Sequence, residues 1–129
     1  MHERTVAGVA ANSLMKGDVL GTARFAGVKA AKDAASLLPL SAPYLVGSTT
    51  IDFTLGDDTI DVEALVRCRD TSGAEMPAFS AVTTALLTIY DMCKSADHTM
   101  TIGPVELVER SGDASSWRRR DEGSGRRDE

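Results

Sequence analysis

The 129-residue chain is poor in aromatic residues and in cysteine, and its basic residues are outnumbered by its acidic ones. Aromatic residues make up 5% of the sequence, so the core must be built from aliphatic side chains. The two cysteines, Cys68 and Cys93, are too few for a disulfide framework, and both lie in patterned apolar segments, which predicts structural thiols. The net charge of −5 argues against non-specific binding to nucleic acid, which requires a basic surface.

Long apolar runs and metal-binding patterns are also absent. No run approaches the roughly 20 residues of a membrane-spanning helix, and residues 1–10 lack the apolar stretch of a signal peptide. We therefore expect a cytoplasmic protein without a membrane partner. His2 and His98 are isolated, and no Cys/His cluster has metal-ligand spacing. We expect no protein-bound metal, although magnesium can accompany a polyphosphate ligand.

Two helices follow from the apolar periodicity. Apolar residues at three- and four-residue spacing predict a helix over residues 17–38, ended by Pro39, and a second helix over 75–96. Gly21 and Gly27 lower the helix propensity of the first segment. We expect close backbone packing against a sheet or a neighbouring subunit to compensate for this cost.

Alternating apolar and polar residues predict strands over 44–55 and 60–69, joined by a turn at 56–58 into an antiparallel hairpin. A last strand is predicted over 99–109. The order helix, strand, strand, helix, strand indicates an α+β fold. One further strand at the front would give the ferredoxin-like βαββαβ arrangement, with an antiparallel sheet and helices on one face. We predict this fold with its first strand missing from the sequence as written.

The composition predicts one domain followed by a tail. Residues 1–112 carry the patterned segments and form the predicted domain. Residues 113–129 are the predicted tail, and from position 118 onward it contains no apolar residue. Such a segment has no surface to bury that would offset the entropy of ordering it, so we expect a disordered charged tail.

Four segments resemble the cyclic pyranopterin monophosphate synthase family of molybdenum cofactor biosynthesis, often called MoaC, in that family's order. They are residues 16–32 (KGDVLGTARFAGVKAAK), 38–43 (LPLSAP), 72–78 (SGAEMPA) and 87–94 (LTIYDMCK), the last being the most specific. The resemblance implies a lyase that converts cyclised 7,8-dihydro-GTP into cyclic pyranopterin monophosphate with release of pyrophosphate. It further implies a ferredoxin-like homo-oligomer, a dimer or a hexamer built from dimers, with active sites at subunit boundaries and a purine or pterin nucleotide as its ligand.

Carried over by position, Lys16 and Lys94 match the family's two catalytic lysines, and Asp91 matches its catalytic aspartate. The resemblance also implies three substrate-binding residues, which are Ser41, Glu75 and Met76. Lysine is a compact cation suited to phosphate, and residues 91 and 94 share one face of the predicted helix. A lysine near other cations or away from water has a lowered pKa and can transfer protons near neutral pH.

Each of these residues also has an ordinary structural interpretation. Asp91 and Lys94 can form a surface ion pair, and Lys16 can be a solvated residue before a helix. Glu75 in the first turn of a helix is favoured by the helix dipole alone. Met76 can belong to the core.

The sequence departs from the family pattern at several of its functional positions. Ser41 and Ala42 replace the family's Cys-His, and Pro77 replaces the second glutamate of its Glu-Met-Glu run. Asp113 and Ala114 stand where the family has a Gly-Lys pair. Serine still donates a hydrogen bond, whereas alanine cannot act as an imidazole does. Met1 falls past the family's first strand, so either the natural chain is longer or the protein is truncated.

Three hypotheses follow from the match and its departures. The first is an active synthase that uses Lys16, Asp91 and Lys94. The second is a catalytically degenerate paralogue that acts as a nucleotide-binding or oligomer-assembly protein. The third is an enzyme with altered catalysis on a related nucleotide.

Overall fold

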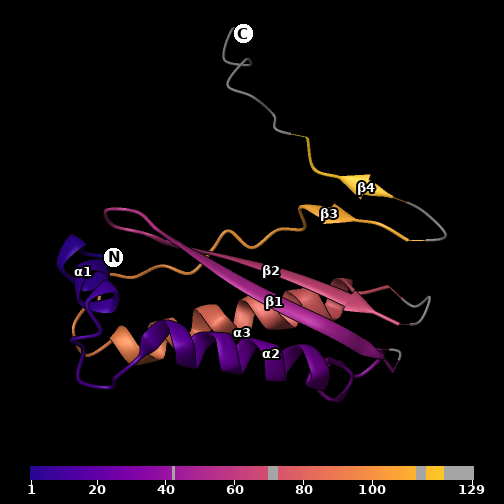
Figure 1. The fold of residues 1–129 in the computed structure, drawn as a ribbon, viewed down its shortest axis with the longest axis horizontal. Helices are drawn as coiled ribbons and strands as arrows, with labels where there is room; N and C mark the ends of the chain where they lie inside the picture. The colour runs from indigo at the N-terminus through magenta and orange to yellow at the C-terminus, as the bar shows by residue number, and fades with distance from the viewer. Residues whose placement is uncertain (42, 70–72, 113–115, 121–129) are drawn as a thin grey trace, which may run out of the picture.

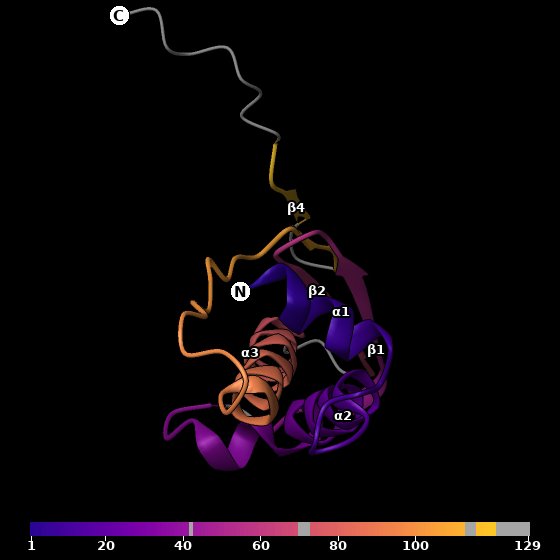
Figure 2. The ribbon, with the colours of Figure 1, turned by 90° about the vertical axis from the view of Figure 1, so that its left-hand side faces the viewer.

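Two antiparallel helices lie beneath a two-stranded hairpin (Figure 1). The computed structural model describes residues 1–41, 43–69, 73–112 and 116–120. The elements in chain order are α1 (Glu3–Ala10), α2 (Val19–Leu37), β1 (Val46–Leu55), β2 (Ile60–Cys68), α3 (Glu75–Cys93), β3 (Glu109–Arg110) and β4 (Trp117–Arg118). Figure 2 shows α2 and α3 side by side, with the hairpin on one side of the pair. The α+β class is thereby confirmed.

The ends of both long helices follow from local sequence signals. Asp18 caps α2, because its Oδ1 accepts a hydrogen bond from the backbone N–H of Gly21 at 2.9 Å. The helix ends at Leu37, two residues before Pro39. The third residue of α3 is Pro77, which is buried in the first turn, where the absence of an N–H costs nothing. The two helices predicted from periodicity are confirmed.

The hairpin is also confirmed, with one face toward the helices and one toward solvent. In its register Ile51 lies opposite Ala64 and Phe53 opposite Val62, and these side chains point toward the helices. The alternate positions lie on the outer face and carry mostly polar side chains, with the exposed Leu65 as an exception. This alternation gives the two-layer packing of a half-buried antiparallel sheet.

Gly27 of α2 lies where the two helices and the hairpin meet. A Cβ added at this position would lie 2.3 Å from Cδ1 of Ile51 and 2.8 Å from the backbone oxygen of Ala81. Ala81 belongs to α3 and is fully buried. The helix backbone approaches its neighbours this closely only because residue 27 has no side chain. The expected compensation for glycine within a helix is therefore confirmed at Gly27, on the sheet side.

Substituting Gly27→Ala is expected to lower the free energy of unfolding by about 1–3 kcal/mol, because the added methyl group must displace the backbone oxygen of Ala81 as well as the end of the Ile51 side chain. Urea denaturation measures the change. Thr83→Ala, at an exposed position of α3, is the control and should change stability by less than about 0.5 kcal/mol. Equal effects of the two substitutions would contradict the close approach at position 27.

Helix α1 was not predicted, and its attachment depends on a carboxylate far along the chain. Asp97 is 1% exposed to solvent. Its Oδ2 accepts hydrogen bonds from the backbone N–H of His2 at 2.7 Å and from Oγ1 of Thr5 at 3.1 Å, while its Oδ1 accepts from Thr99. The bonds from Thr99 and His2 hold the pKa of Asp97 well below its ordinary value. One ionised carboxylate thus ties α1 to the segment after α3.

The stability of the fold should therefore fall in acid. A carboxyl group whose pKa is lower in the folded state stabilises the protein above its unfolded pKa, and this contribution is lost as the pH falls below about 5. Asp97→Asn should lower stability at neutral pH and flatten the acid dependence, because an uncharged amide meets the same donors. Urea midpoints measured at neutral pH and in acid test this. An unchanged acid dependence in the variant would show that Asp97 does not contribute.

The strand predicted over 99–109 is wrong for most of its length. Residues 99–108 form no strand, and only Glu109–Arg110 pair, as β3, with β4. A strand needs a hydrogen-bonded neighbour, and within the described residues β2 pairs only with β1. Pro104 also lacks the N–H that a ladder requires. The ferredoxin-like sheet is therefore not completed among the described residues.

The predicted tail is described only in part. Residues 113–115 and 121–129 lie outside the described residues. Between them, Trp117–Arg118 form β4, and the guanidinium of Arg119 lies over the Trp117 ring, 5.4 Å from its centroid. The boundary of the domain at residue 112 stays a prediction.

Candidate active site

Lys16, Asp91 and Lys94 converge at one end of the helix pair. Nζ of Lys16 donates a hydrogen bond to the backbone oxygen of Asp91 at 3.1 Å, although the two residues are 75 positions apart. Nζ of Lys94 lies 2.8 Å from Oδ1 of Asp91. Antiparallel packing brings the start of α2 beside the end of α3. Gly17, with a φ of 93°, lets the chain turn between Lys16 and the capping residue Asp18.

The electrostatics of this cluster are those of an exposed cation site. The hydrogen bond from Lys94, followed by the charge of Lys16, lowers the pKa of Asp91. The same bond raises the pKa of Lys94. The side chains of Lys94 and Asp91 are 56% and 62% exposed, so water screens their interaction. With both lysines protonated and Asp91 ionised, the cluster carries one net positive charge near neutral pH.

The raised pKa of Lys94 differs from the expectation that a lysine at this site has a lowered pKa. A lysine that accepts protons near neutral pH needs a lowered pKa, and Asp91 shifts that of Lys94 in the opposite direction. Lys94 is therefore arranged to attract an anion, and its contact with Asp91 holds the proton on its amine more tightly. A simple surface pair would involve only residues 91 and 94, whereas Lys16 joins them from a distant segment.

The other three predicted site residues lie at the opposite end of the helix pair. Ser41 follows α2, and its backbone N–H donates to the oxygen of Leu38 at 3.2 Å. Glu75 and Met76 open α3, and the carboxylate of Glu75 pairs with Arg110. A helix of 19 residues such as α2 is about 28 Å long, so the two groups lie far apart within the chain. Ala42 and Ala114, where the sequence departs from the family pattern, lie outside the described residues.

A small cavity at the start of β1 adds cations that the sequence interpretation did not single out. It has a volume of about 370 Å³ and is lined by Lys32, Tyr44, Leu45, Val46 and Arg69. Lys32 lies on α2 and Arg69 just after β2, so nothing in local spacing relates them. Lys32 lies within the first family-like segment, but its charge alone is typical of a solvated helix face. Only the tertiary fold brings these two basic residues to one cavity.

The comparison with known families identifies the chain. The model of the MoaC family matches residues 1–113. The chain belongs to this family. It is 42% identical over 125 residues to the cyclic pyranopterin monophosphate synthase of Pelobacter propionicus. This match covers 95% of this chain and 78% of that protein. It is 45% identical over 117 residues to the synthase of Roseiflexus castenholzii, covering 89% and 74% respectively.

A third relative is a longer protein. The chain is 42% identical over 116 residues to the molybdenum cofactor biosynthesis bifunctional protein of Chlorobaculum tepidum. The match covers 90% of this chain and 37% of that protein. In Chlorobaculum a sequence of this kind is thus one part of a longer polypeptide.

The remaining sequence predictions concern metals, membranes and thiols. Within the described part of the chain, no three His, Cys, Asp or Glu side chains gather as metal ligands would. None of the helices there is long and apolar enough to span a membrane. Cys93 is fully buried, and burial raises the pKa of its thiol, while Cys68 is half-buried. The burial predicted for Cys93 is confirmed.

Proposed function

We propose that this protein is a cyclic pyranopterin monophosphate synthase of molybdenum cofactor biosynthesis. It would convert cyclised 7,8-dihydro-GTP into cyclic pyranopterin monophosphate and release pyrophosphate. Family membership over residues 1–113 supports the proposal. The observation that carries it is the convergence of Lys16, Asp91 and Lys94, since the residues matched to the family's catalytic groups meet through tertiary packing.

The chemistry assigns a role to each of these groups. Lys16 and Lys94 would neutralise the phosphates, whose negative charge shifts toward the departing pyrophosphate during the reaction. Asp91 would orient Lys94 and keep its amine protonated beside the phosphates. Magnesium bound to the polyphosphate would neutralise further charge, without ligands dedicated to it in the protein.

We further propose that the two halves of the site come from different protomers of a homo-oligomer. Met15, beside Lys16, and Leu40, beside Ser41, are each 99% exposed. Apolar side chains exposed at both ends of α2 support a contact there with a second copy of the chain. A two-fold contact along this helix would place the Lys16 end of one protomer at the Ser41 end of the other. The cavity with Lys32 and Arg69 would then face the same phosphates.

Mixing two inactive variants tests both the activity and the shared site. Lys16→Ala disables one half and Glu75→Gln the other, so each homo-oligomer should be inactive in a coupled synthase assay. After unfolding and refolding together, random pairing should restore about a quarter of wild-type activity, because mixed dimers contain one intact site. Wild-type protein without product would contradict the function. Active wild-type protein with no recovery on mixing would contradict only the shared site.

A second candidate function has its own support in the sequence. Ala42 and Pro77 remove an imidazole and a carboxylate, which favours a degenerate paralogue that still binds nucleotides. Calorimetry with GTP, together with the coupled synthase assay, distinguishes the degenerate paralogue from the synthase. Binding without turnover indicates the paralogue, and turnover indicates the synthase. The ferredoxin-like sheet and the cytoplasmic location stay predictions from the sequence.

A further inference from the structure

Asp97 lies just beyond the end of α3, the helix that carries Asp91 and Lys94. Its backbone N–H donates to the oxygen of Cys93, the last residue of α3, at 3.1 Å. Oδ1 of its buried carboxylate accepts hydrogen bonds from the N–H and from Oγ1 of Thr99, at 2.8 Å and 2.7 Å. These contacts fix the carboxylate relative to the end of the helix that bears the candidate site.

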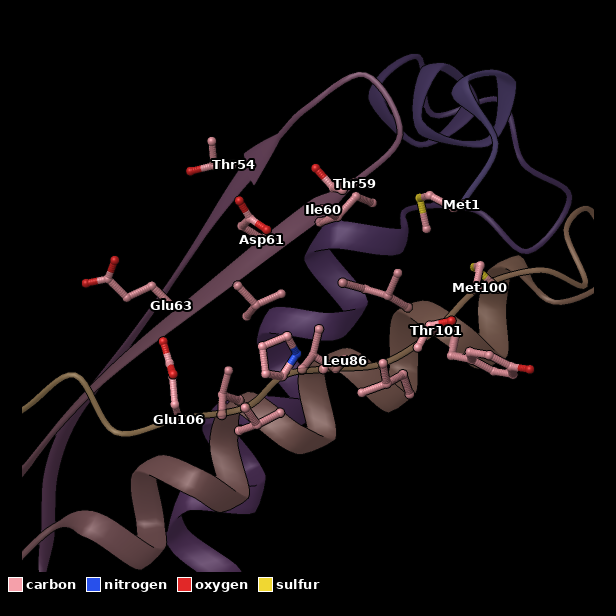
Figure 3. Close-up of a pocket in the computed structure, with 18 of the residues that line it drawn as sticks. Met1, Thr54, Thr59, Ile60, Asp61, Glu63, Leu86, Met100, Thr101 and Glu106 are labelled. Carbon is pink, nitrogen blue, oxygen red and sulfur yellow. The ribbon is translucent and has the colours of Figure 1, made fainter. Parts of the chain in front are cut away.

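The second oxygen of this carboxylate, Oδ2, holds the start of α1. It accepts hydrogen bonds from the N–H of His2 at 2.7 Å and from Oγ1 of Thr5 at 3.1 Å. α1 has eight residues, and the side chain of its N-cap makes no capping bond. A helix this short is not stable by itself, and an anion at its N-terminus favours it. Figure 3 shows Met1 and Met100 at the same end of a cavity beside β2, and both pack against one core cluster. The docking of α1 therefore depends on the carboxylate of residue 97.

Lys16 follows α1 in a short exposed connection. Residues 11–18 form no helix or strand, and of their side chains Leu14 packs against the core. Leu14 also lies on α1, since a Cβ added at Gly8 would be 3.0 Å from its Cδ2. The N–H of Gly17 donates to the backbone oxygen of Leu14 at 3.0 Å, which closes the turn that presents Lys16. The backbone of residue 16 is thus held by α1 on one side and by the start of α2 on the other.

The amine of Lys16 has little else to fix its position. Among the described residues, its Nζ makes one hydrogen bond, to the backbone oxygen of Asp91 at 3.1 Å, and this bond is exposed to water. A long side chain loses rotamer entropy in such a contact, so the bond contributes little to holding the amine in place. The place of the amine therefore depends on its backbone. A displacement of about 1 Å from the reactive arrangement can cost on the order of 100-fold in rate.

We propose that Asp97 is a positioning residue of the candidate site. Through α1 and Leu14 it holds Lys16 beside Asp91 and Lys94, without touching the nucleotide itself. This role rests on the proposed function, because turnover is the property that the place of Lys16 would control. It extends that function to a residue outside the segments that resemble the family.

A double-mutant cycle with Lys16 distinguishes positioning from a general loss of structure. In the otherwise wild-type protein, Asp97→Asn should lower kcat/KM by about 10- to 100-fold, since the amine of Lys16 is then displaced. In the Lys16→Ala background the same substitution should change kcat/KM by less than about threefold, because no amine remains to be misplaced. Equal factors in the two backgrounds would show that Asp97 acts on the fold alone, and would overturn the proposal.

Thr5→Val provides a second variant, which keeps the carboxylate ionised if Asp97→Asn fails to fold. It removes one of the bonds between the carboxylate and α1. Its effect on kcat/KM should be smaller than that of Asp97→Asn but should again disappear in the Lys16→Ala background. Thr83→Ala, an exposed change on α3, is the control and should leave kcat/KM unchanged. An effect of Thr5→Val that persists without the amine of Lys16 would contradict the route through α1.

NMR of the lysine amines tests the position of Lys16 directly and needs no turnover. After reductive methylation with isotope-labelled methyl groups, the signal of Lys16 is identified by its loss in Lys16→Ala. In Asp97→Asn and Thr5→Val it should move toward the signal of Lys29, an exposed lysine of α2. Asp33→Asn, an exposed change of the same charge on α2, should leave it in place.

The two kinds of failure can be told apart. A Lys16 signal that does not move in either folded variant would overturn the positioning role, even in an active enzyme. Wild-type protein that forms no product would contradict the synthase function, while the methyl signal would still report whether Asp97 holds Lys16 in place.

Discussion

Replacing Lys16 or Lys94 by alanine is expected to lower synthase turnover by on the order of 10²–10⁴-fold. Each change removes a cation from the cluster around Asp91, where the two amines lie at 3.1 Å and 2.8 Å from the residue's oxygen atoms. Phosphate charge that develops during pyrophosphate release would then be left uncompensated. A coupled assay that detects the cyclic pyranopterin measures the loss.

The control for this prediction is Lys29→Ala. Lys29 is an exposed lysine of α2 that contributes to neither half of the proposed site. Its removal changes the net charge of the protein by the same amount, so long-range attraction of the nucleotide is matched. Turnover should stay near the wild-type value. If all three alanine variants lose activity equally, general electrostatic attraction explains the effect, and the cluster has no special role.

Restoring an imidazole at position 42 should have the second-largest effect. The family carries histidine where this chain has Ala42, and proton transfer by a positioned side chain contributes on the order of 10²–10⁴-fold. If the protein is a synthase weakened by this change, Ala42→His should raise turnover on dihydro-GTP by on the order of 10²-fold. The same coupled assay, with wild-type protein as reference, measures the gain.

Ala42→Leu distinguishes imidazole chemistry from side-chain bulk, because leucine fills space without donating or accepting a proton. It should give no gain. If Ala42→His also gives none while Lys16→Ala still abolishes activity, the enzyme works by a route that does not use this histidine. Altered catalysis on a related nucleotide would then be the better account.

The helices and the hairpin could be predicted because their signals are local. The spacing of apolar residues and the stop at Pro39 lie within the elements that they define. Helix α1 is short, and its attachment depends on Asp97, more than 90 residues away, so its own sequence gave little indication of it. Residues 99–109 alternate as a strand does, but pairing depends on a neighbour elsewhere in the chain.

The candidate site was predictable only in part, because its residues come together through contacts between segments that are distant in the sequence. The motif around Asp91 and Lys94 identified one helix face, and the resemblance added Lys16, which the fold does bring to them. Ser41 and Glu75 were expected at the same site, yet they lie at the far ends of the helices. The cavity with Lys32 and Arg69 has no counterpart in local spacing, since it forms only where α2 and β2 end together.

The account depends most on Lys16 and Lys94 acting as one unit on an anionic nucleotide. A double-mutant cycle tests this directly, by comparing turnover of Lys16→Ala, Lys94→Ala and the double variant with the wild type. Residues that act together show strongly non-additive losses, so the double variant should be little worse than either single variant. Losses that multiply, as for two independent sites, would contradict the account.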